Sequence, residues 1–340
     1  MEAPLPASDS GKTSAIRRDL EHRLGPLPKA QKYYIVLMTP RSGSNLLCAD
    51  LRRFGFGNPA ETFYRNPKTT KRLYGWETDN FYQHLRLALT YGTVNDIYGL
   101  KISWYQFRAF LAKGRALIGE AARSLNDAEV LDVFFPQARL IALRRRDKIA
   151  QAVSYAKGIQ TGVWQVPKHQ RLNLYRYTAP PIYHQPFIEA CLDELIVADT
   201  LWMDFLHRHH LTYLEVWYED LAENYVETML QVYAYLELTP PERPQPRLKK
   251  LADAQSQAWI RRFTAETAWL HEEAVQKALQ QGDFQRVLLW RFETLADARR
   301  EQIWTRSWGY RTRKIRRWLR RFYLKGQEIT ARSGSQPTSR

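Results

Sequence analysis

The sequence lacks the features that mark extracellular and membrane-spanning proteins. It has only two cysteines, Cys48 and Cys191, too few for a disulfide framework or a cysteine-based zinc site. No run of 18 apolar residues occurs, and the first residues have no apolar segment of the kind found in secretory signals. With 16 glycines and 17 prolines in 340 residues, collagen-like and low-complexity structures are excluded. These absences predict a cytoplasmic protein in a reducing setting.

The composition instead predicts a folded, basic protein. Hydrophobic residues make up 44% of the chain, enough for a large core, and the formal net charge is +16. Nine of the basic residues and no acidic one lie in 305–327, and removing these nine leaves +7. That segment has apolar residues at helical spacing: Ile315, Trp318, Leu319, Phe322 and Tyr323. Such a helix could bind an anionic membrane surface or pack on the main domain, and no known nucleic-acid motif accompanies it.

Four short apolar runs predict buried strands. They are separated by segments with helical spacing or by loops with a helix, an alternation that favours a mainly parallel sheet with helices on both faces. The predicted strands are 33–38, 98–104, 139–143 and 213–217. The predicted fold class is therefore α/β, with a polar, flexible N-terminal arm over 1–32.

The first predicted strand runs directly into a candidate phosphate-binding loop. Residues 39–47 read TPRSGSNLL, small residues and a glycine that open a helix. The N–H groups of a helix start can surround an anion, hydroxyl groups can add hydrogen bonds, and Arg41 supplies positive charge. The loop has no Walker lysine, so it does not predict a standard NTPase site.

A second candidate anion site follows the third predicted strand. Arg144, Arg145 and Arg146 stand at the strand end, and Ser154 lies eight to ten residues further along a predicted helix. A cation and a hydroxyl at this edge could bind a second phosphate, because open α/β sheets bind ligands at the carboxyl ends of their strands. The triplet taken alone could equally be solvated surface.

Together these motifs resemble a known family. TPRSGSNLL, NPAETF at 58–63, YGLKISW at 98–104 and the segment 144–164 are similar to bacterial trehalose 2-sulfotransferases and their lipopolysaccharide-sulfotransferase relatives. The resemblance covers about residues 33–263. It implies a P-loop-like, three-layer sulfotransferase domain and transfer of a sulfuryl group from 3′-phosphoadenosine-5′-phosphosulfate (PAPS) to a carbohydrate hydroxyl, without a metal. Residues 264–327 would form a helical, basic extension, and 328–340 a disordered tail.

The resemblance also assigns roles to individual residues. It implies that Glu61 is the catalytic base and that Arg145 and Ser154 hold the 3′-phosphate, with Arg144 and Arg146 as alternatives in an uncertain register. Asn45 stands where the family often has threonine. The 5′-phosphosulfate would lie on Arg41, Ser42, Gly43, Ser44, Asn45 and Leu46.

Four further residues are weaker candidates for the acceptor site. Lys101, near the end of the second predicted strand, could contact the sulfate or the acceptor, or could pair with an acid. Trp76, Trp104 and Trp164 could stack on sugar rings, although aromatic residues more often belong to the core. Asp220 is interpreted as a helix cap without a catalytic role.

The main hypothesis is a cytoplasmic, PAPS-dependent carbohydrate sulfotransferase. Its acceptor would be a saccharide, a glycolipid or a lipopolysaccharide, and the basic C-terminal helix would allow peripheral binding to the inner face of a membrane. We also consider a homodimer. The alternatives are a P-loop-like small-molecule kinase and a non-catalytic basic protein that binds membranes or polyanions.

Overall fold

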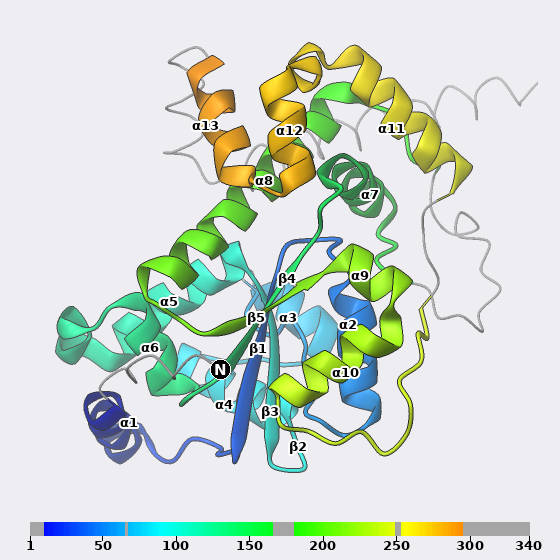
Figure 1. Cartoon of the computed structure of the whole chain (residues 1–340). Helices are drawn as coiled ribbons and strands as arrows, with labels where there is room; N and C mark the ends of the chain where they lie inside the picture. The colour runs from blue at the N-terminus through cyan, green and yellow to red at the C-terminus, as the bar shows by residue number, and fades with distance from the viewer. Residues whose placement is uncertain (1–9, 65–66, 166–179, 249–252, 295–340) are drawn as a thin grey trace, which may run out of the picture. The chain divides into compact units, whose positions relative to one another are not determined.

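The structure is a computed structural model that describes residues 10–64, 67–165, 180–248 and 253–294 (Figure 1). The chain divides into two compact units, which we describe separately. The described residues of the first unit fall within Met1–Arg146 and Val197–Lys249, and those of the second within Asp147–Val166, Gln170–Ile196 and Lys250–Arg340.

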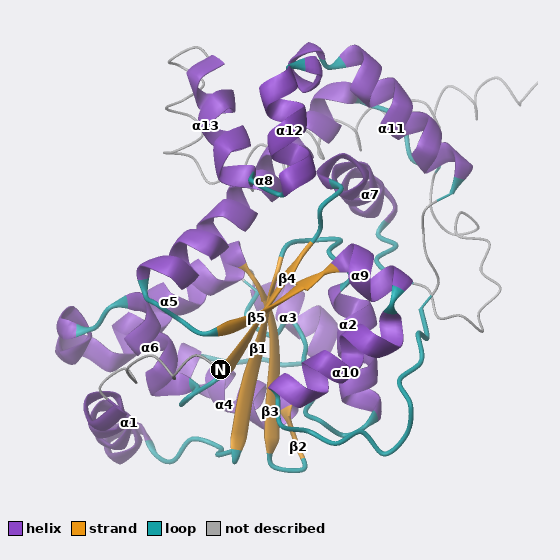
Figure 2. Cartoon of the chain, viewed as in Figure 1, coloured by secondary structure: helices purple, strands orange, loops and turns teal. Residues whose placement is uncertain are grey.

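The first unit is built on one five-stranded sheet, drawn in orange in Figure 2. Its strand order is β2-β3-β1-β4-β5, and all neighbours are parallel except β2, which is antiparallel to β3. The strands are β1 (Lys32–Met38), β2 (Thr93–Val94), β3 (Ile97–Ser103), β4 (Arg139–Arg144) and β5 (Tyr213–Trp217). The four predicted strands are confirmed. The two-residue β2 was not predicted, because so short an edge strand leaves no apolar run in the sequence.

Alternation along β1 divides the apolar residues of this unit into two cores. Ile35 and Leu37 belong to one, and Val36 and Met38 to the other, since successive side chains of a strand point to opposite faces. Helices cover both faces, which confirms a P-loop-like, three-layer α/β fold (Figure 1). The first core is closed by α4 (Phe81–Gly92), α5 (Trp104–Ile118), α6 (Asp127–Phe134) and the later part of α8 (Gln185–Arg208), and the second by α2 (Ser44–Arg53) and α10 (Tyr225–Tyr235).

The central strands β1 and β3 send their following helices to opposite faces of the sheet. Helix α2 follows β1 and packs into the second core, whereas α5 follows β3 and packs into the first. A reversal of this kind opens a crevice at the carboxyl ends of the two strands, where α/β folds bind their ligands.

The segment expected to be a flexible arm contains a helix, α1 (Ser10–Leu24). It packs against α6, where Thr13 donates a hydrogen bond to Asp132 at 2.6 Å. Arg17 donates to the carbonyl oxygens of Val133 and Phe134, at 3.4 and 3.2 Å, at the C-terminus of α6. The last carbonyls of a helix have no partner within it, so Arg17 satisfies two of them and anchors α1.

Short helices connect these elements. Glu61 and its neighbours lead into α3 (Pro67–Tyr74), η1 (Gly119–Ser124) follows α5, and α9 (Tyr218–Glu223) follows β5 directly. No helix in the described part of the chain is both long and apolar enough to cross a membrane.

The second unit is helical. Besides the first residues of α8 it contains α7, α11, η2, α12 and α13, and Lys157 of α7 donates to Asp253, the N-cap of α11, at 2.8 Å. The elements are α7 (Lys148–Thr161), α11 (Ala254–Glu266), η2 (Ala268–His271), α12 (Glu273–Gln281) and α13 (Phe284–Thr294). The basic segment 305–327 and the tail 328–340 lie outside the described residues.

Candidate functional site

The loop between β1 and α2 has an unusual backbone. Arg41 has φ 68° and Gly43 has φ 86°, both in the left-handed region that side chains other than glycine rarely adopt. Space is also short at Gly43, because a Cβ atom there would lie 2.7 Å from Cδ2 of Tyr218. Glycine is therefore required at position 43 by conformation and by contact, and the loop it permits turns directly into α2.

This loop presents hydrogen-bond donors that the protein does not use. The Ser42 hydroxyl is fully buried and has no hydrogen-bond partner within the described residues. Helix α2 begins at Ser44. The N–H group of Leu46 donates to the Gly43 carbonyl at 2.9 Å, whereas those of Ser44 and Asn45, in the first turn, have no acceptor inside the helix. Buried donors without partners are costly, so their presence at a helix N-terminus indicates an anion site.

Two arginines place positive charge beside this loop. Burial first, and next the neighbouring charge of Arg145, lower the pKa of Arg41 to about 10. Arg145 donates to the backbone carbonyl of Arg41 at 3.4 Å, and its guanidinium lies over the Tyr218 ring at 4.5 Å. Two cations held together in a poorly hydrated place repel each other, and an anion bound between them would relieve that repulsion.

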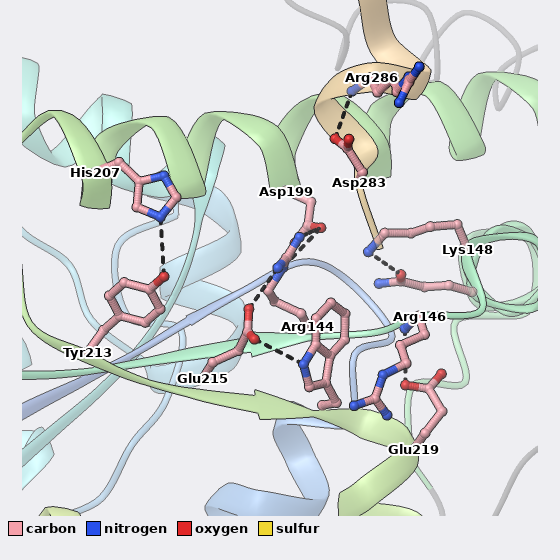
Figure 3. Close-up of polar contacts among 12 residues, drawn as sticks. Arg144, Arg146, Lys148, Asp199, His207, Tyr213, Glu215, Glu219, Asp283 and Arg286 are labelled. Atoms are coloured by element: carbon pink, nitrogen blue, oxygen red, sulfur yellow. Dashed lines mark hydrogen bonds and ion pairs between the residues drawn. The ribbon is translucent and has the colours of Figure 1, made fainter. Parts of the chain in front are cut away.

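The three arginines of the triplet have different partners. Arg144 is held by Asp199 at 3.1 Å and by Glu215 at 2.7 Å (Figure 3). Arg146 pairs with Asp220 at 2.8 Å. Both guanidiniums lie over the Trp217 ring, at 4.5 and 4.8 Å.

Arg145 lies between these two in the chain and is turned away from them. Residues two apart at a strand end share a side, and the residue between them points to the other side. The carboxylate of Glu219 lies 3.9 Å from Nε of Arg145, a longer distance than those from Arg144 and Arg146 to their carboxylate partners. Arg145 is thus the member of the triplet that reaches the loop of Arg41.

The interpretation of Asp220 as a helix cap is wrong. Asp220 is the third residue of α9, whose N-cap is Trp217, and its carboxylate accepts hydrogen bonds from Arg146. The hydrogen bond from that guanidinium lowers the pKa of Asp220. The cap interpretation failed because α9 starts immediately after β5, with no loop between them.

Glu61 is connected to the start of α2 through Lys101. The preceding Ala60 forms a bridge to Leu100 of β3, which fixes the backbone there, and a quarter of the Glu61 side chain is exposed. One carboxylate oxygen lies 3.0 Å from Nζ of Lys101, and the other accepts a hydrogen bond from Gln106 at 3.1 Å. A carboxylate in this position can accept a proton from a bound hydroxyl group.

Lys101 links this carboxylate to the loop. Its Nζ also donates to Oδ1 of Asn45, the second residue of α2, at 2.6 Å. The network therefore connects β3, α2 and the Glu61 segment, and it brings together three residues that were predicted for the site separately.

Aromatic side chains border Glu61. Tyr74 donates to the backbone carbonyl of Glu61 at 3.1 Å and stacks on Trp76, with ring centroids 4.8 Å apart. The Trp76 ring meets Tyr91 edge-on, and Tyr91 is exposed. Burial, and next the charge of Glu61, raise the pKa of Tyr64, which is also hydrogen-bonded to that carboxylate. Aromatic faces of this kind suit the C–H faces of a sugar ring.

The remaining predicted residues have other surroundings. Trp104 packs edge-on against Trp202 at 5.0 Å at the border of the first core. Ser154 and Trp164 belong to the second unit, where Trp164 is 43% exposed and its ring lies 6.2 Å from Tyr155. In the first unit, contacts connect Glu61, Lys101 and Arg145 to the loop between β1 and α2, which leads into Leu46. Trp104 packs elsewhere, against Trp202.

Sequence reasoning missed Gln106 and Tyr218. Gln106 had a usable signal: Ser103 followed three residues later by Gln106 forms a capping box at the start of α5. Tyr218 is the first residue after β5, at the edge of the sheet where ligand sites form. Its contact with Gly43 could not be read from the sequence, because the two residues are far apart along the chain.

The sequence is similar to known sulfotransferases. The family model described as Stf0 sulphotransferase matches residues 33–266. A trehalose 2-sulfotransferase of Mycobacterium tuberculosis is 24% identical over 265 residues, covering 71% of this chain and 97% of its own. A trehalose 2-sulfotransferase of Mycolicibacterium smegmatis is 28% identical over 255 residues, covering 68% and 93%.

One solved structure, a sulfotransferase from Alicyclobacillus acidocaldarius, matches 80% of this chain and 98% of its own at 14% identity, with a TM-score of 0.29. The family match covers well over half of the sequence and includes both the loop and Glu61. The chain belongs to the Stf0 sulphotransferase family.

Proposed function

We propose that this protein transfers the sulfuryl group of PAPS to a hydroxyl group of a carbohydrate. The observation that supports this most is the cluster formed by Arg41, Arg145 and the unpartnered Ser42 hydroxyl at the N-terminus of α2. This cluster has the positive charge that a phosphosulfate anion needs, and its Ser42 hydroxyl is a free donor. Glu61, with a network that connects it to the same loop, lies beside it.

In this proposal the loop holds the donor. Arg41, with residues 42–46, binds the 5′-phosphosulfate, and Arg145 binds the 3′-phosphate. Arg144 and Arg146 are already satisfied by carboxylates, which favours Arg145 for this role. Ser154, in the second unit, remains the predicted partner of Arg145 from the sequence motif.

Glu61 is the proposed catalytic base. During transfer, the acceptor O–H bond and the bond between sulfur and the 5′-phosphate oxygen break, and a new S–O bond to the acceptor oxygen forms. The proton passes to the Glu61 carboxylate, and adenosine 3′,5′-bisphosphate leaves with the electron pair. Arg41 and the α2 N–H groups stabilise the charge that grows on the leaving phosphate, so the residues themselves supply the electrostatic stabilisation.

The acceptor is proposed to be a sugar of the trehalose type. The two mycobacterial relatives are named for trehalose, and Tyr74, Trp76 and Tyr91 offer aromatic faces next to Glu61. A glycolipid or a lipopolysaccharide would present similar rings. We further propose a cytoplasmic enzyme; peripheral membrane binding and a homodimer stay predictions from the sequence.

Two measurements test the function. Adenosine 3′,5′-bisphosphate should raise the melting temperature of the protein, since a ligand that binds only the folded state stabilises it. Radiolabelled PAPS should then transfer its label to trehalose or to a sugar in a lipid extract. Stabilisation by Mg-ATP alone would indicate a kinase, and salt-sensitive binding of any polyanion without transfer would indicate a non-catalytic protein.

A further inference from the structure

We propose that Lys101 is a positioning residue that orients the Glu61 carboxylate and the Asn45 amide together. This inference rests on the proposed function of Glu61 as the base. Lys101 lies on β3 opposite Val36 of β1, and only 8% of its side chain is exposed. A buried ammonium group must be surrounded by hydrogen-bond acceptors. Lys101 donates to Asn45, at the start of α2, and to Glu61.

The contact with Asn45 determines how its amide is oriented. An ammonium group can only donate hydrogen bonds, so the oxygen of the amide must face Lys101, as it does at 2.6 Å. The two N–H donors of Asn45 are then directed away from Lys101. Because Asn45 is in the first turn of α2, these donors are added to the helix N–H groups that would bind an anion.

The contact with Glu61 is matched by a second one on its other oxygen. Gln106 donates to Oε2, and the orientation of Gln106 is itself fixed because its own oxygen accepts the backbone N–H of Ser103 at 3.1 Å. The carboxylate is thus held by Lys101 and Gln106, and it also accepts the hydrogen bond of Tyr64. A carboxylate has about four lone-pair positions, so one is left to take the proton of the acceptor hydroxyl.

Lys101 also balances charge in the crevice. Without it, the Glu61 carboxylate would stand beside an anionic donor with no cation between them, and like charges at short range repel. The same ammonium therefore supports the loop that binds the donor and the group that activates the acceptor. Loss of this group should slow the transfer more than it weakens the binding of adenosine 3′,5′-bisphosphate, which lacks the sulfuryl group.

The test compares Lys101→Met with Lys32→Met in the full-length protein. Lys32 is the first residue of β1, at the end of the strand away from the loop that follows Met38, and it pairs with the exposed Glu237. Replacing Lys32 is therefore a control for the removal of one lysine charge. Lys101→Met should lower kcat by about tenfold or more, the scale of a misplaced base, and should change the affinity for adenosine 3′,5′-bisphosphate less than threefold or so. Lys32→Met should change neither.

A double-mutant cycle with Glu61→Gln shows whether Lys101 acts through Glu61. If it does, Lys101→Met should have little effect on kcat once Glu61 is replaced, because the effects of coupled residues are not additive. The double variant contains neither charge, so it should fold even if Lys101→Met alone does not. Lys101→Gln, whose amide can still donate to Glu61, should retain intermediate activity.

Two results would overturn the positioning role. One is equal loss of kcat from Lys101→Met with and without Glu61, which would mean that Lys101 acts independently. The other is full activity of Lys101→Met. A failure of the proposed function would look different: the unmodified protein would not bind adenosine 3′,5′-bisphosphate or would not transfer sulfate, or Glu61→Gln would keep full activity.

Discussion

Glu194 of α8 should make the stability of the protein depend on pH. Its side chain is buried in the second unit, where Oε1 accepts a hydrogen bond from Tyr155 at 3.1 Å and Oε2 has no partner among the described residues. Burial raises the pKa of Glu194 from 4.5 to about 7, with the Tyr155 hydrogen bond acting in the opposite direction. The folded protein therefore holds this proton more tightly than the unfolded chain does.

The sign and size follow from proton linkage. A carboxyl group whose pKa is raised by folding contributes stability that is fully present below pH 4.5 and is lost as the pH rises toward 7. The difference between the two pKa values corresponds to about 3 kcal/mol of unfolding free energy. Glu194→Gln has the shape of the protonated acid and cannot ionise, so above pH 7 the variant should be more stable than the unmodified protein by up to this amount.

Melting temperatures measured from pH 5 to pH 8.5 test this expectation. The advantage of Glu194→Gln should amount to several degrees at pH 8 and should shrink as the pH falls. Glu223→Gln, a change of the same kind at an exposed position, is the matched control and should change the melting temperature little. A constant difference between Glu194→Gln and the unmodified protein across this range, or a less stable variant at pH 8, would refute the reasoning.

Four other changes probe the donor site and the C-terminal segment. Gly43→Ala should destabilise the fold by about 1–3 kcal/mol, because alanine is strained at φ 86° and has no room there; urea denaturation measures the loss. Glu61→Gln should lower kcat at least about tenfold with little change in donor affinity, as steady-state kinetics and calorimetry would show. Arg145→Ala should weaken binding of adenosine 3′,5′-bisphosphate far more than Arg146→Ala, a comparison that calorimetry can make directly. Deletion of 303–340 should reduce binding to anionic vesicles in a sedimentation assay while donor binding remains; unchanged vesicle binding would exclude the membrane role.

The main strands could be predicted from the sequence because a buried parallel strand leaves a continuous apolar run. The four runs correspond to β1, β3, β4 and β5 almost residue by residue. The loop and Glu61 were found through short motifs whose residues are close together in the chain. Helix α1 was missed because Arg17 anchors it to α6 by contacts between segments more than a hundred residues apart.

Contacts between distant segments also explain what remained open at the site. The sequence could not show which arginine of the triplet faces the loop of Arg41. The carboxylates that bind Arg144 and Arg146, those of Asp199, Glu215 and Asp220, come from later elements. The role of Lys101 depends on the pairing of β1 with β3 and on the bridge at Ala60, neither of which short motifs reveal. Local patterns thus identify the groups, and the tertiary structure decides which of them meet.

The contact between Gly43 and Tyr218 limits how this loop can change over time. A larger residue at position 43 would have to be accompanied by a smaller one at position 218, since the ring of Tyr218 fills the space that a side chain would take. Such compensation would solve only the crowding, because the backbone twist at Gly43 would still disfavour any side chain. The residue at position 218 can therefore be replaced while position 43 stays glycine. Gly43 cannot be replaced without strain, whatever residue stands at position 218.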